Sequence, residues 1–248
     1  MLEHLTYLNE DVTKAAGISE YPKIGEFKNQ SIYNILSSFD STAIANLEAQ
    51  GDKTLSAEVS GYEWAQIIKY LQNNTRLNKL VLTETMETPK GVPLALCFTD
   101  GTPDTREAII AFKGTTGGDE WSDNVEGAIL RDTPDQIEAL EFVQGLPYAD
   151  ITLTGHSKGG NKANYITILC DKVTRCVGFD PQGFSQLFLN DPKYSKRIEE
   201  RASLIKNYSL STDFVHILLY ELPGAKQIFC KGFGVDSTGQ HHLSLIHI

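Results

Sequence analysis

The hydrophobic pattern of the first seventy-five residues predicts short helices rather than strands. Apolar residues are spaced as in helices in segments such as "SIYNILSSF" (31–39) and "YEWAQIIKYLQNN" (62–74). Glycine, proline and asparagine residues separate these segments and mark turns between them. The N-terminal part of the chain is therefore expected to be mainly helical.

Short apolar runs follow, and they predict buried strands. The runs "KLVLTET" (79–85), "VPLALCFT" (92–99) and "EAIIAFKG" (107–114) are rich in Val, Ile, Leu and Phe. Gly, Pro and Asp residues bound them, which is typical of strands buried in a sheet.

From Asp119 onwards, helical and strand-like patterns alternate. Thr133 is the expected N-cap of the second helix, with Pro134 at its first position. Alternation of this kind implies right-handed crossovers and a mostly parallel sheet flanked by helices, which is an α/β fold. Functional sites in such folds lie at the carboxyl ends of the strands. Helices are predicted over 119–130, 133–146, 158–172, 192–202 and 213–220, and strands over 150–155, 175–179, 203–209 and 226–232.

The composition suits one globular domain. The chain has 248 residues, of which 41% are hydrophobic and 22% are charged. These fractions are typical of an α/β domain with a sizeable core. We expect a single domain over residues 1–248, in which residues 1–75 form the mainly helical N-terminal part.

The charge and the N-terminal sequence argue against several partners. A net charge of −10 disfavours binding to nucleic acid or to an anionic membrane surface, since both need clustered Lys and Arg. The segment "MLEHLTYLNEDVTK" has early acidic residues and no continuous apolar core, so we expect neither a secretory signal nor a membrane anchor. No run of the sequence approaches the length of a transmembrane segment.

The cysteines indicate a reducing compartment. They lie mostly inside apolar segments and lack the paired spacing of metal ligands. This favours reduced, buried thiols and a cytoplasmic protein. We therefore expect no metal and no organic cofactor. The four cysteines are Cys97, Cys170, Cys176 and Cys230.

The stretch "ITLTGHSKGGNKANY" (151–165) places Ser157 at the junction of a predicted strand and a predicted helix. Gly155 and Gly159 lie two residues before and after the serine, where larger side chains would collide in a tight turn. Such a turn exposes the hydroxyl at a helix N-terminus, and the backbone N–H of Lys158 points to where an oxyanion would form. We interpret Ser157 as a nucleophile, although a plain glycine-rich turn has the same pattern.

The loop after the strand at 107–114 is a second candidate element. A nucleophile elbow needs a further oxyanion donor from the loop after a neighbouring strand, and Thr115 could provide it. The threonines could equally cap the next helix. In the residues that follow, Trp121, Val125, Ile129 and Leu130 have a spacing that fits a mobile lid or a helix facing the core. We favour the core.

A serine nucleophile needs a histidine as its base. His4 precedes the elbow, and His216 lies inside an apolar helical run, where packing is its expected role. His156 is adjacent to the serine but on the wrong side of the turn to reach its hydroxyl. In folds of this kind the base follows the serine and the acid in the chain, which leaves His241 and His242.

The histidine in turn needs a carboxylate to fix its tautomer. Asp180 in "CVGFDPQGF" and Asp213 in "YSLSTDFVH" both lie where a strand passes into a loop. Either could instead be a helix N-cap, a frequent role of aspartate at such positions. Asp213 is preferred because it follows the later strand.

Several of these motifs together resemble a known family. The segments "AFKGTTGGDEW", "TGHSKGGNKANY", "GFDPQGFS", "STDFVHILL" and "GQHH" are similar to the fungal-type (class 3) lipases, and more closely to their bacterial Mbeg-like branch. The resemblance implies an α/β-hydrolase fold. It also implies Ser157 as nucleophile, Thr115 and Lys158 as oxyanion donors, and Asp213 and His241 as the other triad members. Lys113 stands where those lipases usually carry arginine.

The predicted function is hydrolysis of a small carboxylic ester through an acyl-enzyme. Transfer of the acyl group to another acceptor by the same site is an alternative, and so is a catalytically silent scaffold used for binding. The last six residues, "LSLIHI" (243–248), correspond to a translation of CTGTCTCTTATACACATC, the end of a transposase-based sequencing adapter. We hypothesise that these residues are adapter-derived and that the natural chain continues differently after His242.

Overall fold

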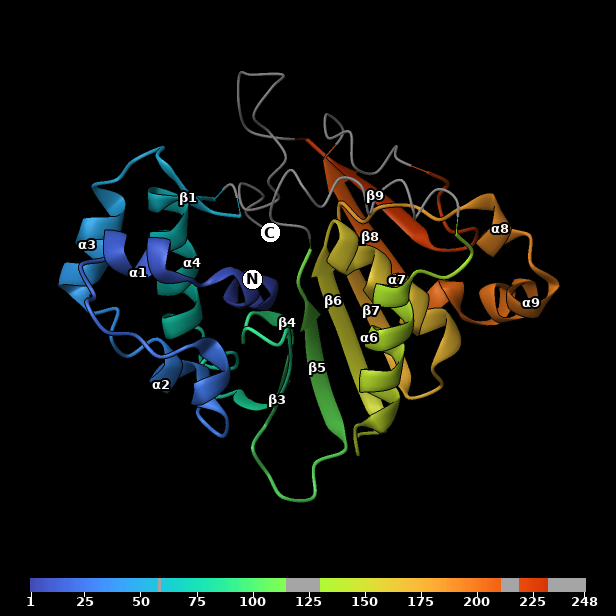
Figure 1. Cartoon of the computed structure of the whole chain (residues 1–248), viewed down its shortest axis with the longest axis horizontal. Helices are drawn as coiled ribbons and strands as arrows, with labels where there is room; N and C mark the ends of the chain where they lie inside the picture. The colour runs from blue at the N-terminus through green and yellow to red at the C-terminus, as the bar shows by residue number, and fades with distance from the viewer. Residues whose placement is uncertain (58, 115–129, 211–218, 232–248) are drawn as a thin grey trace. The chain divides into compact units, whose positions relative to one another are not determined.

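The computed structural model describes residues 1–57, 59–114, 130–210 and 219–231 (Figure 1). The chain divides into two units, of which the first contains Met1–Thr105 and the second Arg106–Leu243. Thr115, Asp213, His241 and His242 lie outside the described residues, as do Trp121, Val125, Ile129 and His216.

Helices make up most of the regular secondary structure of the first unit (Figure 1). Its longest helix, α4, begins after Ser60, whose hydroxyl accepts a hydrogen bond from the backbone N–H of Glu63. The Glu63 carboxylate in turn accepts the N–H of Ser60, which completes a capping box. The helical elements are η1 (Leu2–Tyr7), α1 (Glu10–Ala15), η2 (Ile24–Phe27), α2 (Ile32–Ile35), α3 (Ser41–Glu48) and α4 (Gly61–Asn73).

The helix predicted at 62–74 is confirmed, because Trp64, Ile67, Ile68 and Leu71 form one buried stripe at helical spacing. The helix predicted at 31–39 begins as expected but extends only over α2.

Two antiparallel pairs of strands complete the first unit. The strands β1 (Thr54–Ser56) and β2 (Val59–Ser60) form a short pair. The longer pair, β3 (Val81–Glu87) and β4 (Pro93–Thr99), confirms the strands predicted at 79–85 and 92–99. The middle of β4 is fully buried, as its continuous apolar run requires.

In its described residues, the second unit contains five parallel strands in chain order (Figure 1). They are β5 (Glu107–Phe112), β6 (Asp150–His156), β7 (Val173–Phe179), β8 (Ile205–Leu210) and β9 (Lys226–Cys230). Each pairs in parallel with the next. All five coincide with predicted strands, so their carboxyl ends share one edge of the sheet.

Helices alternate with these strands. The helix α6 (Pro134–Gly145) begins at the predicted N-cap, Thr133, which forms a capping box with Gln136. The helix α7 (Lys158–Leu169) packs on β6 and β7, with α6 beside it (Figure 1). The elements α8 (Gln186–Leu189), α9 (Pro192–Arg201) and η4 (Ala202–Leu204) follow β7. The predicted α/β fold, with mostly parallel strands flanked by helices, is therefore confirmed.

The C-terminal end of α7 is held by an arginine from α9. Arg201 donates from Nε to the carbonyl oxygen of Thr167 at 2.7 Å and from a terminal nitrogen to that of Cys170 at 2.8 Å. These carbonyls belong to the last turn of the helix and its cap, where intrahelical partners are missing. A cation at this end also interacts favourably with the helix dipole.

Two predictions are wrong at the edges of the described segments. The helix predicted at 213–220 does not include its last two residues, because Leu219 has φ +70° and Tyr220 pairs with Phe184 in an isolated bridge. The prediction that Leu130 faces the core is wrong, because this residue is 39% exposed. Its carbonyl oxygen accepts a hydrogen bond from the Ser185 hydroxyl at 2.8 Å, which holds Leu130 against the loop after β7 instead.

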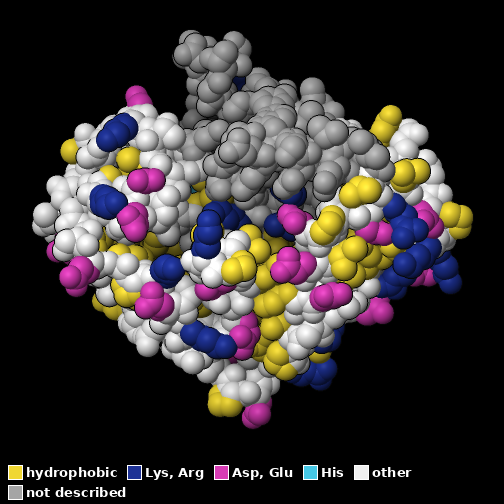
Figure 2. Space-filling model, viewed as in Figure 1, with side chains coloured by type: hydrophobic (Ala, Val, Ile, Leu, Met, Phe, Trp, Pro, Cys, Tyr) yellow, Lys and Arg dark blue, Asp and Glu magenta, His cyan; other side chains and the backbone are white. Residues whose placement is uncertain are grey.

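The cysteines form no disulfide, and side chains of both charges are mixed on the visible surface. All four cysteines are free thiols, and Cys97, Cys170 and Cys176 are buried. Lys and Arg side chains are interspersed with Asp and Glu over much of the visible described surface, and several gather over α9 (Figure 2). Within the part of the chain that the structure describes, no helix is long and apolar enough to cross a membrane.

Candidate active site

Ser157 lies between the last residue of β6 and the first residue of α7. Its backbone has φ +53° and ψ −123°, and its side chain does not cap the helix. For a residue other than glycine, a backbone conformation in this region costs about 1–3 kcal/mol, and it persists only where the surrounding structure imposes it. Ser157 is only half buried, so this conformation presents a serine at the carboxyl end of the central strands.

Glycines allow the close approaches that impose this turn. A Cβ on Gly155 would lie 2.4 Å from the carbonyl carbon of Gly159, and one on Gly159 would lie 2.4 Å from the carbonyl oxygen of Phe112. A Cβ on Gly160 would lie 2.9 Å from the Cβ of Pro181. The first turn of α7 is therefore closely packed against β6, against the end of β5 and against the loop after β7, with no room for a side chain between them.

Hydrogen bonds fix both backbone groups of Ser157. Its N–H donates to the carbonyl oxygen of Phe179 at 3.0 Å. Its carbonyl oxygen accepts the N–H of Asn161 at 3.0 Å and that of Gln182 at 3.4 Å. The serine is therefore tied to α7, to the end of β7 and to the loop that follows β7.

Lys158 occupies the first position of α7. The helix dipole and the N–H groups of the first turn, which have no acceptor within the helix, favour negative charge at this end. The Lys158 ammonium pairs with Asp135 of α6 at 3.0 Å, and its side chain is 15% exposed. This ion pair joins the first turns of α6 and α7.

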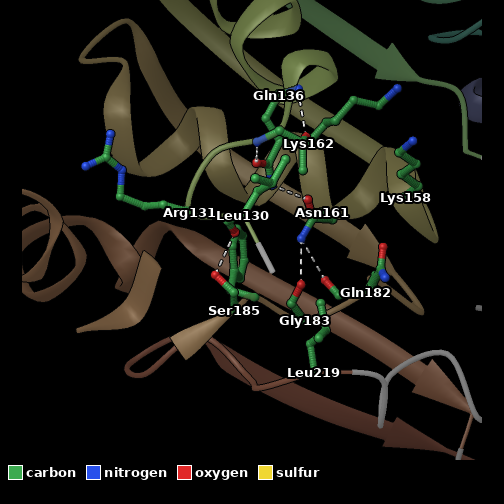
Figure 3. Close-up of a pocket in the computed structure, with 12 residues that line it drawn as sticks. Leu130, Arg131, Gln136, Lys158, Asn161, Lys162, Gln182, Gly183, Ser185 and Leu219 are labelled. Atoms are coloured by element: carbon green, nitrogen blue, oxygen red, sulfur yellow. Dashed lines mark hydrogen bonds between the residues drawn. The ribbon is translucent and has the colours of Figure 1, made fainter. Parts of the chain in front are cut away.

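A narrow pocket lies beside this turn (Figure 3). Its volume is about 20 Å³, which is enough for one water molecule. The described residues that line it therefore do not form a cavity for an acyl chain. Its lining includes the cations Arg131, Lys158 and Lys162 and the amides of Gln136, Asn161 and Gln182.

Asp180, the alternative acid, lies directly after β7 in a left-handed conformation with φ +40°. It is fully buried. Its N–H donates to the carbonyl oxygen of Tyr208, and its Oδ1 accepts the N–H of Leu210, both at 2.8 Å. This aspartate thus links the carboxyl ends of β7 and β8.

The other candidates are dispersed. His4 lies in η1 of the first unit, with its Nδ1 3.3 Å from the Glu3 carboxylate and its ring edge-to-face with Trp64. His156 ends β6 and is half buried, and Lys113 follows β5. Among the described residues, no group of His, Cys, Asp and Glu is arranged to hold a metal ion.

Sequence reasoning missed Asn161, Gln182 and Asp135, which surround the elbow. The available signal was Asn161 itself, an amide four residues after the serine in the predicted helix. Its partners come from α6 and from the loop after β7, so no local pattern identifies them.

The mostly parallel sheet flanked by helices is the fold of an α/β-hydrolase. A family model described as the phospholipase-like "Tle-like phospholipase domain" matches residues 54–242, which is more than half of the chain. The chain therefore belongs to the Tle-like phospholipase domain family. This membership confirms the predicted lipase-like hydrolase class and supports an ester-cleaving hydrolase.

None of the curated proteins matches the chain. Among solved structures, one match is the crystal structure of the 2,6-dihydroxy-pseudo-oxynicotine hydrolase, with a TM-score of 0.29 and 12% sequence identity. That match covers 83% of this chain and 78% of the other.

Proposed function

We propose that the protein is a serine hydrolase that cleaves carboxylic esters through an acyl-enzyme on Ser157. The observation that carries this proposal is the conformation of Ser157 at the junction of β6 and α7. A strained serine between a strand and a helix, hemmed in by glycines, is the arrangement of a nucleophile elbow. An ordinary turn has no need of this strain.

The remaining roles follow from chain order and from the sequence resemblance. His241 takes the proton from the Ser157 hydroxyl as its oxygen attacks the ester carbonyl, and Asp213 holds the imidazole in the correct tautomer. The backbone N–H of Lys158, together with the backbone N–H and the hydroxyl of Thr115, stabilises the negative oxygen of the tetrahedral intermediate. Collapse of the intermediate expels the alcohol, which receives the proton from His241.

Water completes the cycle. His241 deprotonates a water molecule, which attacks the acyl-enzyme carbonyl and forms a second tetrahedral intermediate. The acid then leaves, and the proton returns to Ser157. No metal or organic cofactor takes part in this scheme.

The family description supports an acyl ester of a phospholipid as the substrate class. Among the class 3-like lipases, the motifs quoted above favour the bacterial Mbeg-like branch. The cysteines, which are mostly buried and lack the paired spacing of metal ligands, support a cytoplasmic location. We also propose that residues 1–248 form a single domain.

A fluorophosphonate probe and a series of nitrophenyl esters test the proposal. The wild-type protein should bind the probe covalently on Ser157 and hydrolyse short to medium acyl esters. Ser157→Ala should lose both activities, by several orders of magnitude in rate, while it keeps its fold. Circular dichroism checks the fold. Unchanged turnover in a clean Ser157→Ala preparation would refute the role of Ser157 as nucleophile. If the probe labels Ser157 but the nitrophenyl esters yield no free carboxylic acid, the protein transfers the acyl group to another acceptor instead.

Four further variants test the triad. His241→Ala and Asp213→Asn should both suppress labelling and turnover, since loss of the correct tautomer costs about 10⁴-fold in a serine protease. His242→Ala and Asp180→Asn should retain much more activity. For Asp180, the reason is its position between the ends of β7 and β8. If His242→Ala is inactive and His241→Ala active, the base is His242 and not His241.

A further inference from the structure

Asn161 lies in the second turn of α7, four residues after Ser157, and is only 6% exposed. Its Nδ2 donates to the carbonyl oxygens of Gln182 at 3.1 Å and of Gly183 at 2.8 Å. Its Oδ1 accepts a hydrogen bond from Nε2 of Gln136 at 2.7 Å. Figure 3 shows the Asn161 amide between Gln136 and the backbone of Gln182 and Gly183. Both amide hydrogens are therefore engaged, and the acceptor is matched by a donor.

The segment that Asn161 holds also touches the serine. Gln182, whose carbonyl accepts from Asn161, donates its own N–H to the carbonyl oxygen of Ser157. Pro181, the residue before it, is in close contact with Gly160 of α7. Asn161 thus closes a small ring of contacts between the first two turns of α7 and the loop after β7.

Gln136 extends this ring to a third element. Its backbone N–H and its side-chain oxygen both belong to the capping box with Thr133. The start of α6 is therefore fixed to the same amide that fixes the loop after β7. The three elements line the pocket beside Ser157.

We infer that Asn161 is a positioning residue for the reaction at Ser157. A nucleophile held in a strained conformation needs surroundings that over-determine it, and Asn161 joins α6 and the loop after β7 to the turn that carries the serine. The inference rests on the proposed function, because it assigns Asn161 a role only through a reactive Ser157.

A buried amide could instead serve stability alone, and the two roles differ in what they predict. A stabilising residue affects the fraction of folded molecules, and the folded molecules then react at the wild-type rate. A positioning residue affects the rate constant of every folded molecule, because a misplacement of about 1 Å can cost about a hundredfold in rate. The amplitude and the rate constant of covalent labelling therefore separate the roles.

Asn161→Asp is the variant of choice, since aspartate has nearly the same shape but loses both N–H donors. Asn164→Asp is the matched control. Asn164 lies on the same helix and is 2% exposed, but its Oδ1 accepts from the Cys176 thiol of β7 at 3.3 Å. The same change there leaves the acceptor in place and removes no hydrogen bond to the carbonyl oxygens of Gln182 and Gly183.

The measurement is the rate constant and final amplitude of Ser157 labelling by a fluorophosphonate, with thermal unfolding recorded in parallel. Asn161→Asp should react about 10- to 100-fold more slowly but reach full amplitude. Its kcat for a short nitrophenyl ester should fall by a similar factor, with KM within about threefold of the wild-type value. Asn164→Asp should keep a rate constant within about threefold of wild type.

The outcomes separate the two proposals. Full-rate labelling of Asn161→Asp, or a reduced amplitude at the wild-type rate constant, overturns the positioning role and leaves Ser157 as the nucleophile. An equal loss of rate in Asn164→Asp also overturns it. If the wild-type protein is not labelled at Ser157 at all, both proposals fail. Should Asn161→Asp not fold, Asn161→Ser, which is smaller and keeps one donor, is measured in the same way and judged by the same rate constant.

Discussion

Replacement of Gly159 by alanine tests whether the close contact between β5 and α7 maintains the elbow. The added Cβ would lie 2.4 Å from the carbonyl oxygen of Phe112 and 2.8 Å from the carbonyl carbon of Lys113. Both are backbone atoms, so no side-chain rotation can relieve the contact. The end of β5 and the first turn of α7 must therefore separate by at least about 0.6 Å to restore an allowed distance.

The cost follows from two opposing effects. Alanine is a better helix former than glycine by about 1 kcal/mol, whereas overpacking of this kind costs about 1–3 kcal/mol. Because the clash is between backbone atoms, we expect a cost in the upper part of that range. The free energy of unfolding should therefore fall by about 2 kcal/mol in total. In a chain of this size, the melting temperature should fall by about 4–8 °C. The rate of Ser157 labelling should fall about 10- to 100-fold.

Gly145→Ala is the matched control. Gly145 ends α6, is exposed, and has no atom within 4 Å of an added Cβ. Alanine should therefore stabilise the protein by up to about 1 kcal/mol there and leave labelling unchanged. Thermal unfolding and fluorophosphonate labelling measure both variants. A Gly159→Ala protein that melts and labels like the wild type would refute the argument from close packing.

Three further predictions concern other parts of the molecule. Thr115→Val should lower kcat about 10²- to 10³-fold with little change in KM, if Thr115 is an oxyanion donor; a change confined to KM would make it a binding residue. Arg201→Met should destabilise the protein by about 1–3 kcal/mol in urea unfolding, because the last carbonyls of α7 lose charge-assisted hydrogen bonds; an unchanged midpoint would contradict this. Burial raises the pKa of both the Cys97 and Cys176 thiols to about 12, so a thiol reagent at pH 8 should modify them only after unfolding. Rapid modification of the folded protein would show that these thiols are accessible.

The sequence determined the elements whose causes are local. Thr133 and Pro134 mark the start of α6 because an N-cap hydroxyl and a fixed proline φ act within one turn. The five parallel strands were predictable because each is a short apolar run between turn residues. The tight strand-to-helix turn at Ser157 was also predictable, since it depends on glycines spaced two residues on either side of the serine.

The tertiary structure decided everything that depends on partners distant in the chain. Leu130 has an apolar side chain and was assigned to the core, but its carbonyl bonds to Ser185, 55 residues later, and the side chain stays exposed. Tyr220 is predicted to be helical, but its backbone N–H and carbonyl oxygen pair with Phe184 in an isolated bridge.

Asn161 shows the limit most clearly. Its partners in α6 and after β7 are 25, 21 and 22 residues away, and nothing in the residues around it identifies them. Periodicity and propensity describe how a segment prefers to fold by itself. Which buried amide meets which carbonyl depends on how the folded elements pack, and only the tertiary structure contains that information.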